Sequence, residues 1–205
     1  YHYVPKIAGV GNQVSVIWNG QDVEGVHSVF TRLSANSGAS FGEAVNLTRG
    51  VIPEGKALQA GQETLAAQGN YVYSLFVTTA MNVYLRRSTN GGVDFLGLQE
   101  LTSSNAPYLT QGWWPVIKTD PTVASGAKVH VFWDWPAYCS SIDGGATFTK
   151  PELVTPYFSY SGALASGANS PYMAIGPDAK VHFTMQARYY SNTFGGYGDF
   201  DTFYR

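Results

Sequence analysis

Apolar and other residues alternate along four short stretches of the chain, with the period of two that is typical of β-strands. These stretches read NQVSVIW, NYVYSLF, KVHVFW and KVHFTM, and they end at Trp18, Phe76, Trp133 and Met185. A shorter run of small and apolar residues stands before each, namely PKIAGVG, ETLAAQG, PTVASG (residues 121–126) and PYMAIG, and we expect it to form a first strand. No segment shows sustained helical periodicity with caps, so the pattern predicts an all-β protein.

An eight-residue box recurs three times between these stretches. The copies SANSGASF, STNGGVDF and SIDGGATF begin at residues 34, 88 and 141, about 54 residues apart. An Asn or Asp side chain can accept backbone N–H bonds, glycine permits positive φ, and Phe can return to a core. The box therefore predicts a tight turn between two strands. The residues shared by the copies are Ser34, Asn36, Gly38 and Phe41, then Ser88, Asn90, Gly92 and Phe95, then Ser141, Asp143, Gly145 and Phe148, and the third copy adds Thr147.

Each box is flanked by two further β-like runs, so one unit holds four strands in about 55 residues. That layout is typical of a propeller blade. We expect a single domain over residues 1–205, with blades at about 1–50, 51–104, 105–157 and 158–205. The last unit stops at DTFYR, where the next box would begin, so the fourth blade is expected to be incomplete.

Three arrangements fit an incomplete fourth blade. The chain is part of a larger propeller with more blades, or a compact ring of about four blades, or one of several identical chains that pair their sheet edges in an oligomer. We favour the first.

The box S-x-D-x-G-x-T-F resembles the Asp-box, or BNR, repeat of sialidase-like β-propellers. The third copy matches every key position, whereas Asn36 and Asn90 replace the Asp in the others, and Ser40 and Asp94 take the place of the Thr. Through the repeat, the resemblance covers nearly the whole chain. It implies a sialidase-like β-propeller in which each box is a turn between the third and fourth strands at the outer edge of a blade. We therefore expect a structural role for the box residues, with each Phe filling the gap between two sheets.

Composition narrows the function classes. Only 13% of the residues are charged, and the 12 Lys and Arg are scattered, so we expect no nucleic-acid partner. No apolar run approaches the ~18 residues of a membrane span. The lone Cys139 excludes an intrachain disulfide and is expected to be a small buried hydrophobe. Asp143 is one carboxylate among glycines, too few ligands for Ca²⁺, and we expect no metal and no cofactor.

The family resemblance also implies what a catalytic member needs. Sialidases hold the substrate carboxylate with three arginines, and they use a Tyr nucleophile assisted by Glu and an Asp acid/base. The arginines here are Arg32, Arg49, Arg86, Arg87, Arg188 and Arg205. None stands in the Arg-Ile-Pro context typical of the family, and only Arg49 and Arg188 fall in segments that could reach the centre. We therefore assign no catalytic residue.

Aromatic residues gather in the loops that would meet at one mouth of a propeller, and they are the candidate ligand-binding residues. Sugar rings stack their C–H faces on aromatic rings and bond their hydroxyls to polar neighbours. The candidates are Tyr108, Trp113, Trp114, Trp135, Tyr157 and Tyr160, with Asp134 beside them. We favour the alternative that these rings pack blade against blade or subunit against subunit. Trp114-Pro115 is typical of the entry into a first strand, which supports packing for Trp114 in particular. His130 and His182 share one repeat position, which favours a packing or edge role over metal binding.

These observations predict a non-catalytic, extracellular propeller that acts as a glycan- or protein-binding or assembly module. The competing class is a sialidase-type glycoside hydrolase, exo-α-sialidase-like, or a fragment of one. The family resemblance and the first residue, Tyr1 rather than Met, favour a secreted or cell-surface protein. The expected partner is a glycan or a protein surface.

Overall fold

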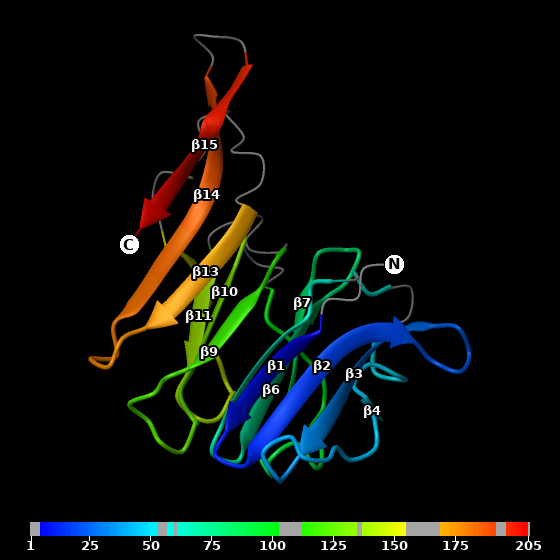
Figure 1. Cartoon of the computed structure of the whole chain (residues 1–205). Helices are drawn as coiled ribbons and strands as arrows, with labels where there is room; N and C mark the ends of the chain where they lie inside the picture. The colour runs from blue at the N-terminus through cyan, green and yellow to red at the C-terminus, as the bar shows by residue number, and fades with distance from the viewer. Residues whose placement is uncertain are drawn as a thin grey trace.

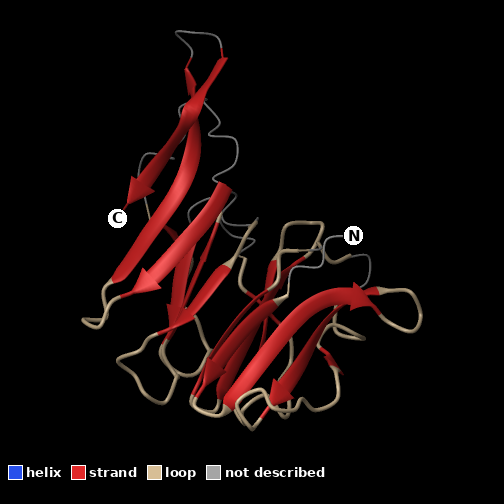
Figure 2. Cartoon of the chain, in the orientation of Figure 1, coloured by secondary structure: helices blue, strands red, loops and turns tan. Residues whose placement is uncertain are grey.

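The computed structural model describes most of the chain, and every regular element in the described part is a strand (Figure 2). The described residues are 5–52, 57–59, 61–102, 112–134, 137–154, 169–191 and 196–204. No helix occurs among them, so the all-β prediction is confirmed. No helix long and apolar enough to cross a membrane was found in the described part either.

The strands form four antiparallel sheets, and each sheet follows the order of the chain. The first sheet holds β1 (Lys6–Val10), β2 (Gln13–Gln21), β3 (His27–Ser34) and β4 (Val45–Asn46). The second holds β5 (Thr64–Gln68), β6 (Tyr71–Val77), β7 (Val83–Ser88) and β8 (Gln99–Glu100). The third holds β9 (Val116–Thr119), β10 (Val129–Trp133), β11 (Ala137–Ser141) and β12 (Glu152–Leu153). The fourth has three strands, β13 (Asn169–Ile175), β14 (Val181–Ser191) and β15 (Gly196–Tyr204).

The first strands of successive sheets lie against one another, β1 on β5, β5 on β9 and β9 on β13. Figure 1 shows the sheets side by side in chain order, from the blue β1–β4 to the orange and red β13–β15. Sheets that meet through their first strands and extend outwards through the following strands are the blades of a β-propeller. The described chain is therefore a partial propeller, as the repeat predicts.

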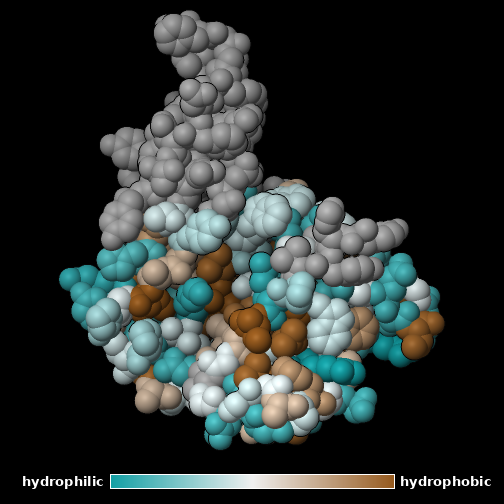
Figure 3. Space-filling model, in the orientation of Figure 1, coloured by the Kyte–Doolittle hydropathy of each residue, from teal (hydrophilic) through white to brown (hydrophobic). Residues whose placement is uncertain are grey.

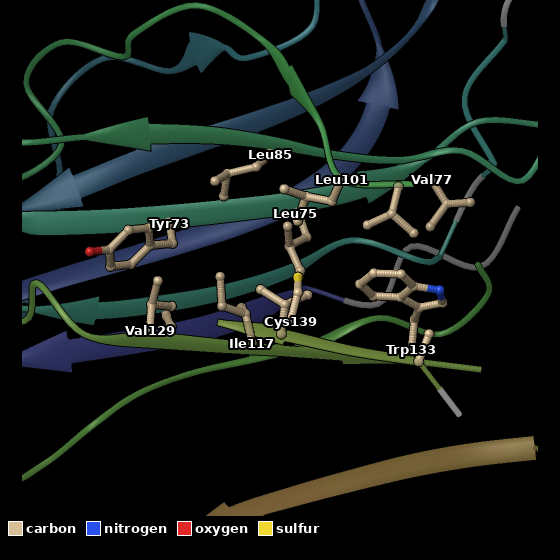
Figure 4. Packing of buried hydrophobic residues seen from close by; sticks show 13 residues of the cluster. Tyr73, Leu75, Val77, Leu85, Leu101, Ile117, Val129, Trp133 and Cys139 are labelled. Carbon is tan, nitrogen blue, oxygen red and sulfur yellow. The ribbon is translucent and has the colours of Figure 1, made fainter. Parts of the chain in front are cut away.

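Alternating side chains on each sheet fill the two gaps beside it. On β6, Val72 and Phe76 pack towards the first sheet, and Tyr73, Leu75 and Val77 pack towards the third. Figure 4 shows the gap between the second and third sheets, where side chains of both sheets interdigitate. Full burial of side chains of this size contributes about 1.5–3 kcal/mol each. This packing is the main physical link between blades.

The third sheet differs from the prediction at its first strand. The small-residue run 121–126 was expected to be that strand, but β9 lies earlier, directly after Pro115. Residues 121–126 instead form turns, because Asp120 accepts hydrogen bonds from the backbone N–H and the hydroxyl of Thr122, at 2.9 and 2.6 Å. A local side-chain cap thus outweighs the weak strand signal of small residues.

Cys139 lies in the same gap as Trp133 and is fully buried, as expected for a small hydrophobe. Burial raises the pKa of its thiol to about 12. The thiol is therefore neutral and unreactive at physiological pH.

One face of the first sheet is uncovered among the described residues. The residues at one matched position of the first strands are Ile7, Leu65, Ile117 and Met173. The last three are buried against the preceding sheet, whereas Ile7 is 71% exposed. Figure 3 shows hydrophobic atoms gathered over β1 and β2 on the side turned to the viewer. The first sheet therefore carries a blade-packing face without a preceding blade in the described chain.

A matched ring pair supports this interpretation of the uncovered face. Phe76 and Tyr84 stack at 6.2 Å between centroids and pack against the first sheet. Trp18 and Phe30 stack at 5.7 Å in the corresponding place on the first sheet. An open pocket of about 470 Å³ lies here, lined by Pro5, Val16, Trp18, Asn19 and Gly20.

Glycine is required where the second and third sheets approach each other most closely. A Cβ on Gly126, at φ +77°, would lie 2.1 Å from the backbone oxygen of Gln68, whereas a Cβ on Gly11, at φ +57°, would meet nothing. We expect Gly11→Ala to cost about 1 kcal/mol, from the left-handed backbone alone. Gly126→Ala should cost about 3 kcal/mol, because the backbones must also separate. Urea unfolding of both variants measures the difference, and equal losses would show that the two sheets are not in contact here.

Candidate functional site

The three boxes form the same turn. The Ser hydroxyl at the first position donates to the Oδ1 of the Asn or Asp at the third position, at 2.8 Å in every copy. The same Ser oxygen accepts the backbone N–H of the fifth position at 2.8–2.9 Å. The Oδ1 accepts the N–H of the seventh position at 2.9–3.0 Å. The polar groups of the box are therefore used within the turn.

The hydrogen bond between the third and seventh side chains of the box has opposite directions in the Asn and Asp copies. Asn36 donates from Nδ2 to the Ser40 hydroxyl at 2.8 Å, and Asn90 donates to the Asp94 carboxylate at 3.0 Å. In the third box the hydroxyl of Thr147 donates to Asp143, at 2.7 Å. This hydrogen bond, with those from the Thr147 amide and Ser141, holds the pKa of Asp143 far below its ordinary value. Asp143 is thus an ionised turn residue whose oxygens are already occupied.

The box phenylalanines do not all have the expected environment. Phe95 packs on the apolar cluster between the first and second sheets, and Phe148 on the cluster between the second and third. Phe41 was expected to fill such a gap, but its side chain is 39% exposed, so that prediction is wrong. Phe95 and Phe148 pack towards the sheet that precedes their own. No sheet precedes the first one among the described residues, so Phe41 has no such surface to pack against.

Two arginines of the second sheet join neighbouring blades near the boxes. Arg86 donates to the backbone oxygens of Leu47, Leu96 and Phe95, at 2.8, 3.0 and 2.9 Å. Arg87 donates to the oxygen of Gly144 in the third box at 3.1 Å. Arg86 and Arg87 therefore each make one contact between blades. Arg49 pairs instead with Glu24 in the hairpin between β2 and β3.

The candidate ligand-binding residues lie at the opposite end of the sheets, where the first strands begin and the second strands end. We call this the mouth end. The N–H of Trp114 donates to Oε1 of Gln62, just before β5, at 2.9 Å, and the N–H of Asp134 donates to the oxygen of Trp113 at 2.9 Å. The structure therefore brings Trp113, Trp114 and Asp134 together. The other candidates, Tyr108, Trp135, Tyr157 and Tyr160, lie outside the described residues.

Trp114 differs from a packed core residue. Its side chain is 47% exposed, and its backbone lies in the left-handed region at φ +50°, which is uncommon for any residue except glycine. The bond to Gln62 holds the backbone there. An exposed indole fixed beside polar groups can stack against a ligand.

Glu63 is a mouth-end residue that the sequence reasoning did not identify. It is 2% exposed, and neither carboxylate oxygen has a hydrogen-bond partner among the residues that the structure describes. Burial raises the pKa of Glu63, and the backbone amides of Glu63 and Gly61 and the charge of Lys6 offset this only in part. The sequence does set Glu63 apart, because the other three units hold proline at the corresponding position, as Pro5, Pro115 and Pro171.

A buried polar network lies at the other end of the third sheet, away from the mouth end. The carboxylate of Asp120 pairs with Lys128 at 2.7 Å and lies 3.7 Å from Nε2 of His130. The Nδ1 of His130 lies 2.6 Å from the hydroxyl of Tyr138, and the two rings stack. Burial opposes ionisation of Asp120, but bonds from Lys128 and Thr122 outweigh it and lower its pKa. These contacts fit the packing role expected for His130.

Comparison with known proteins gives the class of fold. No protein-family model matches the sequence, and no curated protein matches it either. A variant of the NanB sialidase from Streptococcus pneumoniae superposes with a TM-score of 0.56 at 8% identity, over 92% of this chain and 27% of that protein. The intramolecular trans-sialidase from Ruminococcus gnavus gives 0.57 at 7% identity, over 98% and 71%. A Trypanosoma rangeli sialidase gives 0.50 at 11%, over 90% and 34%.

The chain therefore has the sialidase-like β-propeller fold. It spans about a quarter of the pneumococcal enzyme and about seven tenths of the Ruminococcus enzyme. At these identities the likeness concerns the fold alone.

The box turns can be tested by substitution in the third copy. We expect Asp143→Asn to keep the stability of the parent, because Asn36 and Asn90 already make the same turn. Ser141→Ala should cost about 1–3 kcal/mol, because the buried N–H of Gly145 loses its acceptor. Chemical denaturation distinguishes the two variants. If Asp143→Asn were as damaging as Ser141→Ala, the turn would depend on the charge rather than on hydrogen-bond geometry.

His130 should make stability depend on pH. Burial, helped by Lys128, lowers the pKa of His130 in the folded state, against a partial opposing effect of Asp120. The unfolded chain then binds the proton more readily, so the free energy of unfolding should fall as pH drops below about 6.5, down to the lowered pKa. Urea unfolding between pH 7.5 and 5 should show a steeper fall for the parent than for His130→Asn. Parallel pH curves would contradict this assignment.

Proposed function

We propose that this chain is a glycan-binding propeller module that recognises its ligand at the mouth end and does not hydrolyse it. The observation that carries this proposal is the half-exposed indole of Trp114, whose backbone N–H is held by the polar side chain of Gln62. An aromatic face next to polar side chains has the chemistry that a sugar ring needs, with stacking on one side and hydroxyl bonding on the other.

The arginines support a binding role over catalysis. Arg86 and Arg87 are held in contacts between blades, and Arg49 is paired with Glu24. A sialidase-type mechanism needs several guanidinium groups that converge on one carboxylate. The alternative function is a sialidase-type glycoside hydrolase, favoured by the fold of the neighbours, with the catalytic groups supplied from outside the described residues.

We further propose that the chain is one domain of Asp-box blades within a larger propeller. The uncovered face of Ile7, Trp18 and Phe30 matches faces that elsewhere pack against a preceding blade. The described sheets occupy residues 6–46, 64–100, 116–153 and 169–204, and the blades proposed around them are about 1–50, 51–104, 105–157 and 158–205. An extracellular or cell-surface location, where glycans are abundant, belongs to the same proposal. The alternative to further blades is an oligomer of identical chains.

Removal of the indole should weaken glycan binding. We expect Trp114→Ala to reduce affinity for glycans bound by the parent about tenfold or more, corresponding to a loss of at least ~1.4 kcal/mol. Ile142→Ala is the matched control, because Ile142 is an exposed apolar residue in the third box, at the opposite end of the sheet. A glycan array followed by titration of the bound glycans measures both.

Hydrolysis is tested in parallel with a fluorogenic sialoside. No release of the fluorophore is expected from purified protein. Release above a buffer control would favour the hydrolase alternative, and an array without any bound glycan would contradict the glycan-binding proposal.

A further inference from the structure

The uncovered face of the first sheet, which carries Ile7, Trp18 and Phe30, repeats a face of the second sheet that is covered. Trp18 and Phe30 are cross-strand partners on β2 and β3, as Phe76 and Tyr84 are on β6 and β7. The second pair is 1% and 2% exposed because the first sheet packs on it, whereas the first pair is only partly buried. The covered copy therefore shows what fits the uncovered one, namely the apolar side of a blade.

Arg32 adds a polar contact to the uncovered face, because it matches Arg86 on the covered face. Each arginine stands two residues before the Ser that opens a box, and Arg32 follows Phe30 by two residues, on the same side of β3. Arg86 donates to the backbone oxygen of Leu47, which directly follows the fourth strand of the preceding blade, at 2.8 Å. Arg32 is exposed and has no hydrogen bond or ion pair with a described residue. Arg32 is thus placed to donate to the corresponding backbone oxygen of a blade on this face.

The first box differs from the other two at the position that a preceding blade touches. Gly91 and Gly144 hold the fourth place of their boxes, and a Cβ on them would lie 2.6 Å from Gln13 and 2.2 Å from Tyr71. Those two neighbours are the first residues of β2 and β6, the second strands of the preceding blades. The first box holds Ser37 here, at φ +58°, so a Cβ is already present. A blade that packs on the first sheet in the same way has less room at the start of its second strand, and a small residue fits there.

We propose that the uncovered face binds one further blade of the same repeat, with Arg32 as the hydrogen-bond donor and Ser37 as the residue that selects a small side chain opposite. This inference deepens the larger propeller proposed above and rests on it. Such a blade removes Ile7, now 71% exposed, from water and closes the open pocket of about 470 Å³ beside Trp18. Each contact between described blades joins a sheet to the one immediately before it in the sequence. The partner is therefore assigned to the same polypeptide, ahead of β1, rather than to a second copy.

The test supplies such a blade from the chain itself. In an extended chain, a copy of residues 1–62 is joined ahead of Pro5. Because Pro5 holds the position of Glu63 in the repeat, the copy precedes β1 as the first blade precedes β5. The copy carries Gln13→Ala, which gives its second strand a small first residue, and Trp18→Phe, so that mass spectrometry identifies Trp18 of the original blade. A second extended chain keeps Gln13 in the copy.

Two measurements are compared between the parent and the extended chains. Hydroxyl-radical footprinting should find Trp18 oxidised severalfold more slowly in the extended chain, because the added blade covers it. Arg32→Ala should lower the melting temperature of the extended chain by about 3–6 °C and leave that of the parent nearly unchanged, because only the extended chain supplies an acceptor. Lys150→Ala is the matched control, since it removes an exposed cation from the third blade and should act alike in both chains. The extended chain that keeps Gln13 should melt at a lower temperature than the one with Gln13→Ala.

Four results would overturn the inference, and each is distinct. If Trp18 is oxidised equally in the parent and extended chains, the face receives no blade, and the larger propeller fails with this inference. If Trp18 is protected but Arg32→Ala lowers both melting temperatures equally, the role of Arg32 is wrong while the larger propeller stands. If both extended chains melt at the same temperature, Ser37 does not select the partner. If the parent is a dimer by light scattering, with Trp18 protected only in the dimer, the partner is a second copy.

Discussion

Packing of each sheet against the sheet before it is the constraint on which the rest of this structure depends. A four-stranded sheet with two apolar faces is not stable alone, because it must remove both faces from water. The second and third sheets do so completely, and residues such as Phe76 and Trp133 mark the faces turned to the preceding sheet. The same geometry leaves Ile7 and Trp18 on a face that, in the described chain, has no preceding sheet.

The two ends of the sheets have different physical roles because of this packing. At the box end, polar groups are consumed by the fold: turns close on Asp143 and its counterparts, and Arg86 and Arg87 join neighbouring blades. At the mouth end, the side chains of Glu63 and Asn19 are buried without hydrogen-bond partners among the described residues, and the indole of Trp114 is exposed on a backbone in the left-handed region. Stability therefore comes from one end and recognition is proposed at the other, as is common for loops on a rigid scaffold.

Much of the fold could be predicted from the sequence, because the patterns that determine it are local and recur in every unit. Alternation with period two, glycines in the boxes and a recurrence of about 54 residues predicted the strands, turns and blades. The prediction failed in two places, one decided by a single side chain and one by the neighbouring sheet. Asp120 turns residues 121–126 into a loop, and Phe41 has no preceding sheet to pack against among the described residues.

The sequence by itself determined the all-β class, the repeating four-stranded unit and the box turns, since each depends on residues close together in the chain. Only the tertiary structure showed that Trp114 is held by Gln62, about 50 residues away, and that the side chains of Glu63 and Asn19 are buried without hydrogen-bond partners in the described part of the chain. Burial and hydrogen-bond satisfaction depend on what neighbouring blades place around a side chain. No local pattern contains that information, and so the candidate site emerged only when the sheets were packed together.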